Sequence, residues 1–158
     1  MTGVQTCALP ISTIDEVAEN LRIVAAALGD PRRAAPTLAR IAALRATSPQ
    51  RGIDTIWLGH GGLTQSPGSL GTKWMALAGL AQRSLTGGRA SFEALITSPP
   101  KILVTSNYRA GQVSQGQRWL AHPLLANLPS RRIATDGRAW TCGGPMMIGE
   151  IERLRAAR

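Results

Sequence analysis

Three short apolar runs alternate with helical stretches along the chain, and this alternation limits the fold more than any other feature. Each run leads into a polar or glycine-rich loop, and helix signals follow, such as the cap at Ser69 and the stop at Pro99-Pro100. Strands that alternate with helices pair in parallel through right-handed crossovers. The sequence therefore predicts an α/β fold with a parallel-sheet lobe flanked by helices, built on strands at 53–58, 101–106 and 131–135.

Helices are expected around these strands. They run from Ser69 to about Ala78, over SFEALITS (91–98), over QRWLAHPLLANL (117–128) with a break at Pro123, and from Pro145 to about Arg155. The segment DGRAWTCGG (136–144) carries no helical periodicity and is expected to form a loop.

Two further helices precede the first strand. The first begins at Ser12 or Thr13, with Glu16 in capping-box spacing from Thr13, and ends before Gly29. Its apolar face follows 3-4-3-4 spacing over Ile14, Val17, Leu21, Val24 and Leu28.

The second helix is expected to take Asp30 as its cap and Pro31 as its first residue, and to run to about Thr47. Pro36 either bends this helix or moves its start further along the chain. Both helices would present apolar stripes that call for a partner surface.

The first twelve residues, MTGVQTCALPIS, differ in composition from the rest of the chain. They carry no charge, whereas the chain from Thr13 on is rich in Ala, Leu and Arg. Back-translated with ordinary codons, they resemble one reading frame of a common sequencing-library adaptor, and they lack the basic region and long apolar core of a signal peptide. We therefore interpret residues 1–12 as an adaptor-derived artefact, and we expect the true N-terminal part of the gene product to be missing.

The net charge of +9 has two interpretations. One is a nucleic-acid or anionic-membrane partner. The other is a GC-rich gene, because Arg outnumbers Lys sixteen to two and only Arg32-Arg33 and Arg131-Arg132 are adjacent. A binding stripe requires clustering, so we favour the second interpretation, expect no nucleic-acid partner, and keep a basic nucleic-acid-binding α/β module as the alternative.

The sequence does not match the motifs of catalytic or cofactor-binding sites that we tested. The loop GHGGLTQSPGSLGTK follows a strand and opens a helix, but it fits neither a dinucleotide fingerprint nor a Walker loop, so a nucleotide-using enzyme is a weak third reading. The residues His60, His122 and Cys142 are too scattered to form a metal cluster. We expect a protein that is not an enzyme and holds neither a cofactor nor a metal of its own.

Ligands of open parallel sheets bind beyond the carboxyl ends of the strands. The loops at these ends carry glycines, arginines and aromatic residues, which suit a flat and partly anionic ligand. A buried Trp140 and solvated arginines are the competing interpretation. The residues expected to bind ligand are His60, Gly62, Tyr108, Arg109, Arg138 and Trp140.

The order of these pieces resembles the substrate-binding proteins of ABC importers for iron–siderophore, haem and cobalamin. The resemblance extends from Thr13 to the C-terminus and is carried mainly by PGSLG before LALAGL-type text and by WTCGGP before the last helix. The family has two α/β lobes joined by a long, stiff helix, with the ligand held between them. Pro100-Lys101 departs from the Pro-Asp that the family often has before the second strand.

The resemblance implies a division of the chain. Residues 13–29 correspond to the last helix of a missing N-terminal lobe, residues 30–48 to the interlobe connecting helix, and residues 52–158 to the C-terminal lobe. It also implies a periplasmic location, a monomer when intact, and delivery of the ligand to a membrane permease. Iron–siderophore ranks before cobalamin and haem as the expected ligand.

One residue role follows from the resemblance. A glutamate near the start of a short helix, in a Ser-x-Glu setting, pairs with permease arginines in this family. Ser91-Phe92-Glu93 matches that setting, so Glu93 is the expected permease-docking residue. The competing interpretation is a glutamate that only stabilises the first turn of its helix.

Overall fold

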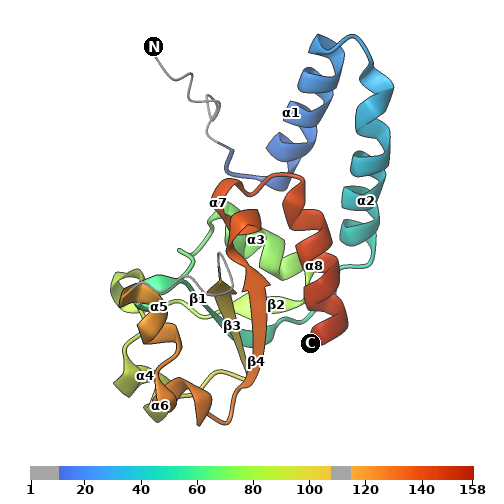
Figure 1. Cartoon of the computed structure of the whole chain (residues 1–158). Helices are drawn as coiled ribbons and strands as arrows, with labels where there is room; N and C mark the ends of the chain where they lie inside the picture. Colours follow the sequence, from blue (N-terminus) through green and yellow to red (C-terminus); the bar gives the residue numbers. More distant parts are fainter. Residues whose placement is uncertain (1–10, 108–114) are drawn as a thin grey trace, which may run out of the picture.

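The protein is a four-stranded parallel sheet covered by helices on both faces, and the computed structural model describes residues 11–107 and 115–158 (Figure 1). The strand order is β2-β1-β3-β4. Every neighbouring pair runs in parallel. The strands are β1 (Ile53–Leu58), β2 (Leu80–Gln82), β3 (Ile102–Asn107) and β4 (Arg131–Asp136).

The three predicted strands are confirmed within one residue, and β2 is an addition. β2 has only three residues and follows helix α3 (Leu70–Leu77) after a single turn, so its sequence carries no alternation to detect. Its pairing with β1 is extended by two backbone bonds, from Ile53 N–H to the Gly79 carbonyl (2.8 Å) and from Arg83 N–H to the Thr55 carbonyl (2.8 Å).

The two faces of the sheet bury separate apolar clusters. Trp57 and Val104 point to the cluster under α3, α7 (Gly137–Cys142) and α8 (Met146–Ala157). Leu58 and Leu103 point to the other cluster, which is covered by α4 (Phe92–Thr97), α5 (Gln115–Leu120) and α6 (Pro123–Ala126). This division follows from the alternation of side chains along each strand.

Helices α1 (Ile14–Ala27) and α2 (Ala35–Ala46) form an antiparallel hairpin beside the sheet (Figure 1). The predicted capping box is present, because Thr13 Oγ1 accepts from Glu16 N–H (3.1 Å) and Glu16 accepts from Thr13 N–H (3.2 Å). The predicted second helix divides at Pro36 into the 3-10 turn Pro31–Ala34 and α2. The proline thus delays the start of the regular helix.

The apolar face of α1 is only half covered. Ile14 and Val17 are buried in the core, whereas Val24 and Leu28 are 56% and 69% exposed. The far end of the hairpin is therefore an unpartnered apolar surface.

The last helix fastens α2 to the lobe. Arg155 of α8 donates to the carbonyls of Leu77 (2.7 Å) and Leu44 (2.5 Å) and to Thr47 Oγ1 (2.6 Å). These acceptors lie at the C-terminal ends of α3 and α2, where carbonyls lack helical partners. One guanidinium therefore joins three helices.

The expectation of a loop at 136–144 is wrong. Residues Gly137–Cys142 form α7, which begins with Asp136 accepting from Arg138 N–H (3.0 Å) and ends at Gly143 with φ 62°. The cap and the stop make this helix, because six residues are too few to show an apolar period. Helix α8 starts directly after Pro145, as predicted.

No helix among the described residues has the length and apolar character required to cross a membrane.

Candidate functional site

The carboxyl ends of β1, β3 and β4 lie at one edge of the sheet. Leu58 is in register with Thr105, and Asn107 is in register with Asp136. Because all these strands are parallel, the segments that follow them leave from the same edge, which we call the carboxyl edge. Two predicted site residues of this edge, Tyr108 and Arg109, lie outside the described residues.

Trp140 links the carboxyl edge to the core. It lies on α7, is partly buried, and its indole nitrogen donates to Thr135 Oγ1 (2.7 Å). Its ring centroid is 5.4 Å from that of Trp57, with a tilt of 46° between the planes. Trp140 therefore has a packing role, and part of its surface remains exposed.

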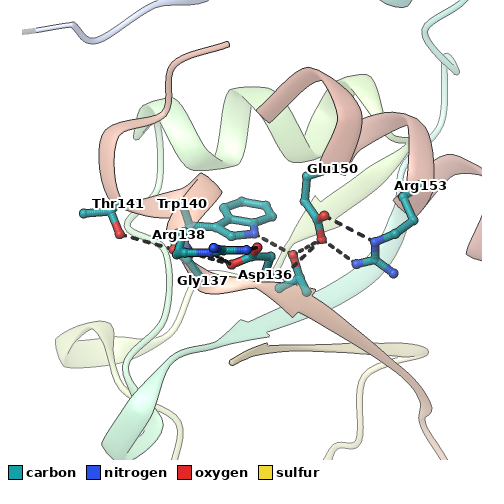
Figure 2. A network of polar contacts seen from close by, with 8 residues as sticks. Asp136, Gly137, Arg138, Trp140, Thr141, Glu150 and Arg153 are labelled. Carbon is teal, nitrogen blue, oxygen red and sulfur yellow. Dashed lines mark hydrogen bonds and ion pairs between the residues drawn. The ribbon is translucent and has the colours of Figure 1, made fainter. Parts of the chain in front are cut away.

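A buried carboxylate supports this arrangement (Figure 2). Glu150 of α8 is 9% exposed and accepts hydrogen bonds from Thr135 Oγ1 and from Asp136 N–H (3.3 Å). Arg153 donates to Glu150 from Nε (3.2 Å) and from a terminal nitrogen. Sequence reasoning missed these residues, because Glu150 and Arg153 look like surface residues of an amphipathic helix.

Arg138 is at the carboxyl edge but already has a partner. Its guanidinium makes a bidentate contact with Asp136, with Nε 3.0 Å from both carboxylate oxygens. The hydrogen bonds from Arg138 lower the pKa of Asp136. The Arg138 side chain remains 67% exposed, so an anionic ligand would have to share it with Asp136 or displace it.

His60 and Gly62 form the 3-10 turn His60–Gly62 directly after β1. His60 is exposed, whereas Gly62 is buried. Gly62 has φ 76°, and a Cβ placed there would lie 2.7 Å from the Ala90 carbonyl oxygen and 2.9 Å from the Trp119 ring. Packing and backbone conformation therefore account for this glycine without a ligand.

The glycine loop does not form a phosphate cradle. Gly59 N–H donates to the Leu63 carbonyl (2.7 Å), which closes the loop on itself. Helix α3 starts only at Leu70, with Ser69 accepting from Thr72 N–H (3.3 Å). The loop amides and the helix start are thus separate, which contradicts the nucleotide reading.

Two buried polar atoms of the described chain lack a hydrogen-bond partner: the Trp57 indole nitrogen and the Ser106 hydroxyl. Ser106 pairs in register with Thr135 near the carboxyl edge. Buried donors of this kind normally have a partner. They add unmet hydrogen-bonding capacity near the end of the sheet.

Glu93 lies on the opposite face of the sheet from Trp140. It is in the first turn of α4, where Ser91 Oγ caps the helix by accepting from Ala94 N–H (3.1 Å). Hydrogen bonds from its own backbone and from the Ser91 hydroxyl lower the pKa of Glu93. This exposed carboxylate is therefore ionised at neutral pH.

Glu93 differs from most other carboxylates of the described chain in its lack of an ion pair. Seven of the nine carboxylates form ion pairs with arginines: Asp15, Glu19, Asp30, Asp54, Asp136, Glu150 and Glu152. Glu16 is held in its capping box. Among the described residues, Glu93 alone is an exposed carboxylate with neither an ion pair nor a place in such a box.

The described residues contain no group of three His, Cys, Asp or Glu side chains arranged to hold a metal ion.

Sequence comparisons gave no family model and no curated protein that matches this chain. Comparison with solved structures did give matches. A periplasmic heme binding protein from Pseudomonas aeruginosa aligns with a TM-score of 0.63 at 23% identity, over 90% of this chain and 59% of its own. An ABC-type Fe3+-hydroxamate transport protein from Saccharomonospora viridis aligns with a TM-score of 0.70 at 16% identity, over 94% and 58%.

The chain has the fold of a lobe of these binding proteins. It spans less than two thirds of their length. The molybdate periplasmic binding protein from Haemophilus influenzae also shares the fold, with a TM-score of 0.60 at 17% identity, over 90% of this chain and 49% of its own. Its ligand is an oxyanion, so the binding-protein fold alone does not select a ligand.

Proposed function

We propose that this chain is part of the solute-binding component of an ABC importer and that its carboxyl edge contributes half of a ligand site. The observation that carries the proposal is the convergence of β1, β3 and β4 at one edge that also presents Trp140 and Arg138. The likeness to periplasmic binding proteins supports it. The chain acts by binding and delivery, without chemical conversion of the ligand.

The proposed ligand is a metal chelate, with iron–siderophore ranked before cobalamin and haem. A chelate carries its own metal ligands, which suits an edge without a metal-binding cluster among the described residues. Its flat organic part would pack on Trp140, and its carboxylate or catecholate oxygens would pair with Arg138. Two of the solved structures bind heme or belong to a ferric hydroxamate system, which agrees with this class.

The remaining proposed site residues are His60, Gly62, Tyr108 and Arg109. His60 would meet the ligand directly, since it is exposed in the turn after β1. Gly62 would act through the shape of that turn, because its own position is tightly packed.

The proposed organisation assigns residues 13–29 to the last helix of a first lobe, 30–48 to the interlobe connection and 52–158 to the second lobe. The exposed Val24 and Leu28 at the far end of the hairpin suit contact with another lobe. The intact protein would be a periplasmic monomer.

Calorimetric titration tests the ligand proposal. The chain is titrated with ferrioxamine B, haemin and cyanocobalamin, and with iron-free desferrioxamine as the control. We expect saturable binding of ferrioxamine B, weakened about fivefold or more in Arg138→Ala and Trp140→Ala, since each loses about one charged or aromatic contact. Absence of saturable binding for all three chelates would refute chelate binding by this half of the site, and unchanged affinity in both variants would remove Arg138 and Trp140 from it.

Glu93 is the proposed contact to the permease. In a chain with a net charge of +9, an exposed and ionised carboxylate without a cationic partner is suited to a basic surface on another protein. The competing interpretation, stabilisation of the first turn of α4, requires no partner.

Reversal of the Glu93 charge distinguishes contact with the permease from stabilisation of the first turn of α4. Glu93→Lys is expected to lower chelate uptake in permease-containing proteoliposomes while the affinity for ferrioxamine B stays unchanged. Glu19→Lys, at an exposed carboxylate that is already paired with Arg22 (3.0 Å), serves as the matched control. Normal uptake with Glu93→Lys would leave only the helix-stabilising role.

The alternative is a basic nucleic-acid-binding module, which the net charge favours. Against it, arginines of several different elements are held by carboxylates, as in Arg40–Glu152 and Arg83–Asp54. Duplex DNA binding measured from 50 to 200 mM salt decides the matter. A steep salt dependence with submicromolar affinity would favour the nucleic-acid module over a binding-protein lobe.

A further inference from the structure

The hydroxyl of Thr135 sits between two groups of opposite character. The Trp140 indole can only donate, and an ionised carboxylate can only accept. A threonine hydroxyl has one proton, so a proton given to Glu150 leaves an oxygen lone pair for the Trp140 N–H. The series of hydrogen bonds therefore runs in one direction, from the Trp140 N–H to the Thr135 hydroxyl and from that hydroxyl to the Glu150 carboxylate.

The charge of Glu150 is secured by its surroundings. Burial raises the pKa of Glu150, but the hydrogen bonds from Arg153 and Thr135 outweigh burial, and the pKa lies below its usual value. Arg153 also donates to the Ala134 carbonyl (2.5 Å), so the guanidinium is itself anchored to β4. Glu150 is thus ionised and an acceptor at neutral pH.

The Glu150 carboxylate also bonds to the residue that caps α7. Glu150 accepts from Asp136 N–H (3.3 Å), and the Asp136 side chain in turn caps α7 and holds Arg138. Figure 2 shows contacts from the end of β4 and from Arg153 converging on Glu150, whereas Trp140 and Arg138 of α7 are reached through Thr135 and Asp136. One buried group of α8 is therefore joined to both Trp140 and the Asp136–Arg138 pair.

We propose that Glu150 is a positioning residue of the carboxyl edge, which acts through the Thr135 hydroxyl to fix the orientation of the Trp140 indole. Its consequence for ligand affinity rests on the proposed function. Without the Glu150 acceptor, the Thr135 hydroxyl is free to turn its proton elsewhere, and the Trp140 N–H loses a partner held in place. The Trp140 indole ring is then no longer held in one orientation at the carboxyl edge.

The test follows the indole proton of Trp140 by nuclear magnetic resonance, with the signal assigned from Trp140→Phe. Thr135→Val has nearly the same shape as the native residue, and Glu150→Leu replaces the carboxylate with a shorter apolar side chain. Each variant removes one of the two groups that link Trp140 to α8. In both variants we expect the indole proton to exchange with solvent about tenfold faster, the factor expected for one lost hydrogen bond. Glu152 lies on the same helix as Glu150 and pairs with Arg40 of α2, so Glu152→Gln, which weakens that exposed pair, is the control and should leave the exchange unchanged.

Titration of the same proteins with ferrioxamine B measures the effect of these substitutions on ligand affinity. Affinity should fall in Thr135→Val and at least as much in Glu150→Leu, which also loses the contact with Asp136 N–H. The double variant should be no worse than Glu150→Leu alone. An unchanged indole exchange rate in Glu150→Leu would overturn the positioning role, and so would an unchanged rate in Thr135→Val, a substitution that the fold should tolerate. Failure of the native chain to bind any chelate would instead refute the proposed function and leave the exchange result standing.

Discussion

The indole rings of Trp57 and Trp140 lie 5.4 Å apart, with 46° between their planes, and so join the last half of β1 to α7. Tilted aromatic pairs at this spacing are favourable beyond the area they bury. Trp57 is 8% exposed, whereas Trp140 reaches the carboxyl edge. The pair therefore couples the stability of the core to the shape of the candidate site.

Substitutions of Trp140 should separate its packing from its hydrogen bond. Trp140→Phe keeps an aromatic ring beside Trp57 and loses the bond to Thr135, so it should cost about 1 kcal/mol in the free energy of unfolding. Trp140→Ala also leaves a cavity and should cost about 3 kcal/mol. Denaturant unfolding monitored by circular dichroism measures both. Equal costs for the two variants would show that ring packing contributes nothing.

Arg155 should be the most sensitive arginine of the lobe. Arg155→Ala removes bonds to the ends of both α2 and α3 and should lower the free energy of unfolding by about 2–3 kcal/mol, with faster amide exchange in α2. Arg22→Ala, at an exposed pair with Glu19, should cost less than about 0.5 kcal/mol. A similar loss in both variants would contradict the role of Arg155 as a link between helices.

Two glycines with nearly the same backbone conformation should respond differently to alanine. Gly62 and Gly68 have φ 76° and 74°, so both substitutions carry the cost of a left-handed conformation, about 1 kcal/mol. Only at Gly62 would the added methyl collide with the Ala90 carbonyl, whereas Gly68 has open space around it. Gly62→Ala should therefore be the more destabilising by about 1–3 kcal/mol in thermal or denaturant unfolding.

Acid should weaken the fold through Glu150. The pKa of Glu150 in the folded chain lies below the ordinary value of a glutamate, so its ionised form stabilises the native state above that ordinary value. This contribution is lost as the pH falls through the folded pKa, because the carboxylate must then be protonated. Wild type should lose stability between about pH 5 and pH 3, and Glu150→Gln should have a flatter profile over that range. Parallel profiles for the two proteins would show that Glu150 does not contribute.

The elements that sequence determined by itself are those with local causes. The β-branched runs at β1, β3 and β4 and the capping residues Thr13 and Ser69 specify their structures through neighbours a few residues away. The alternation of these elements was enough to predict a parallel sheet with one carboxyl edge. The expected site residues also followed from that edge.

What tertiary structure decided depends on residues that are distant in the sequence. Strand β2 exists because β1 offers it a free edge, and Gly62 is constrained by its close contacts with Ala90 and Trp119. The role of Glu150 appears only when α8 packs against the end of β4, since a buried carboxylate needs donors from other elements. Hydrogen bonds and packing between elements are set by three-dimensional proximity, and a pattern read along one chain contains local spacing only.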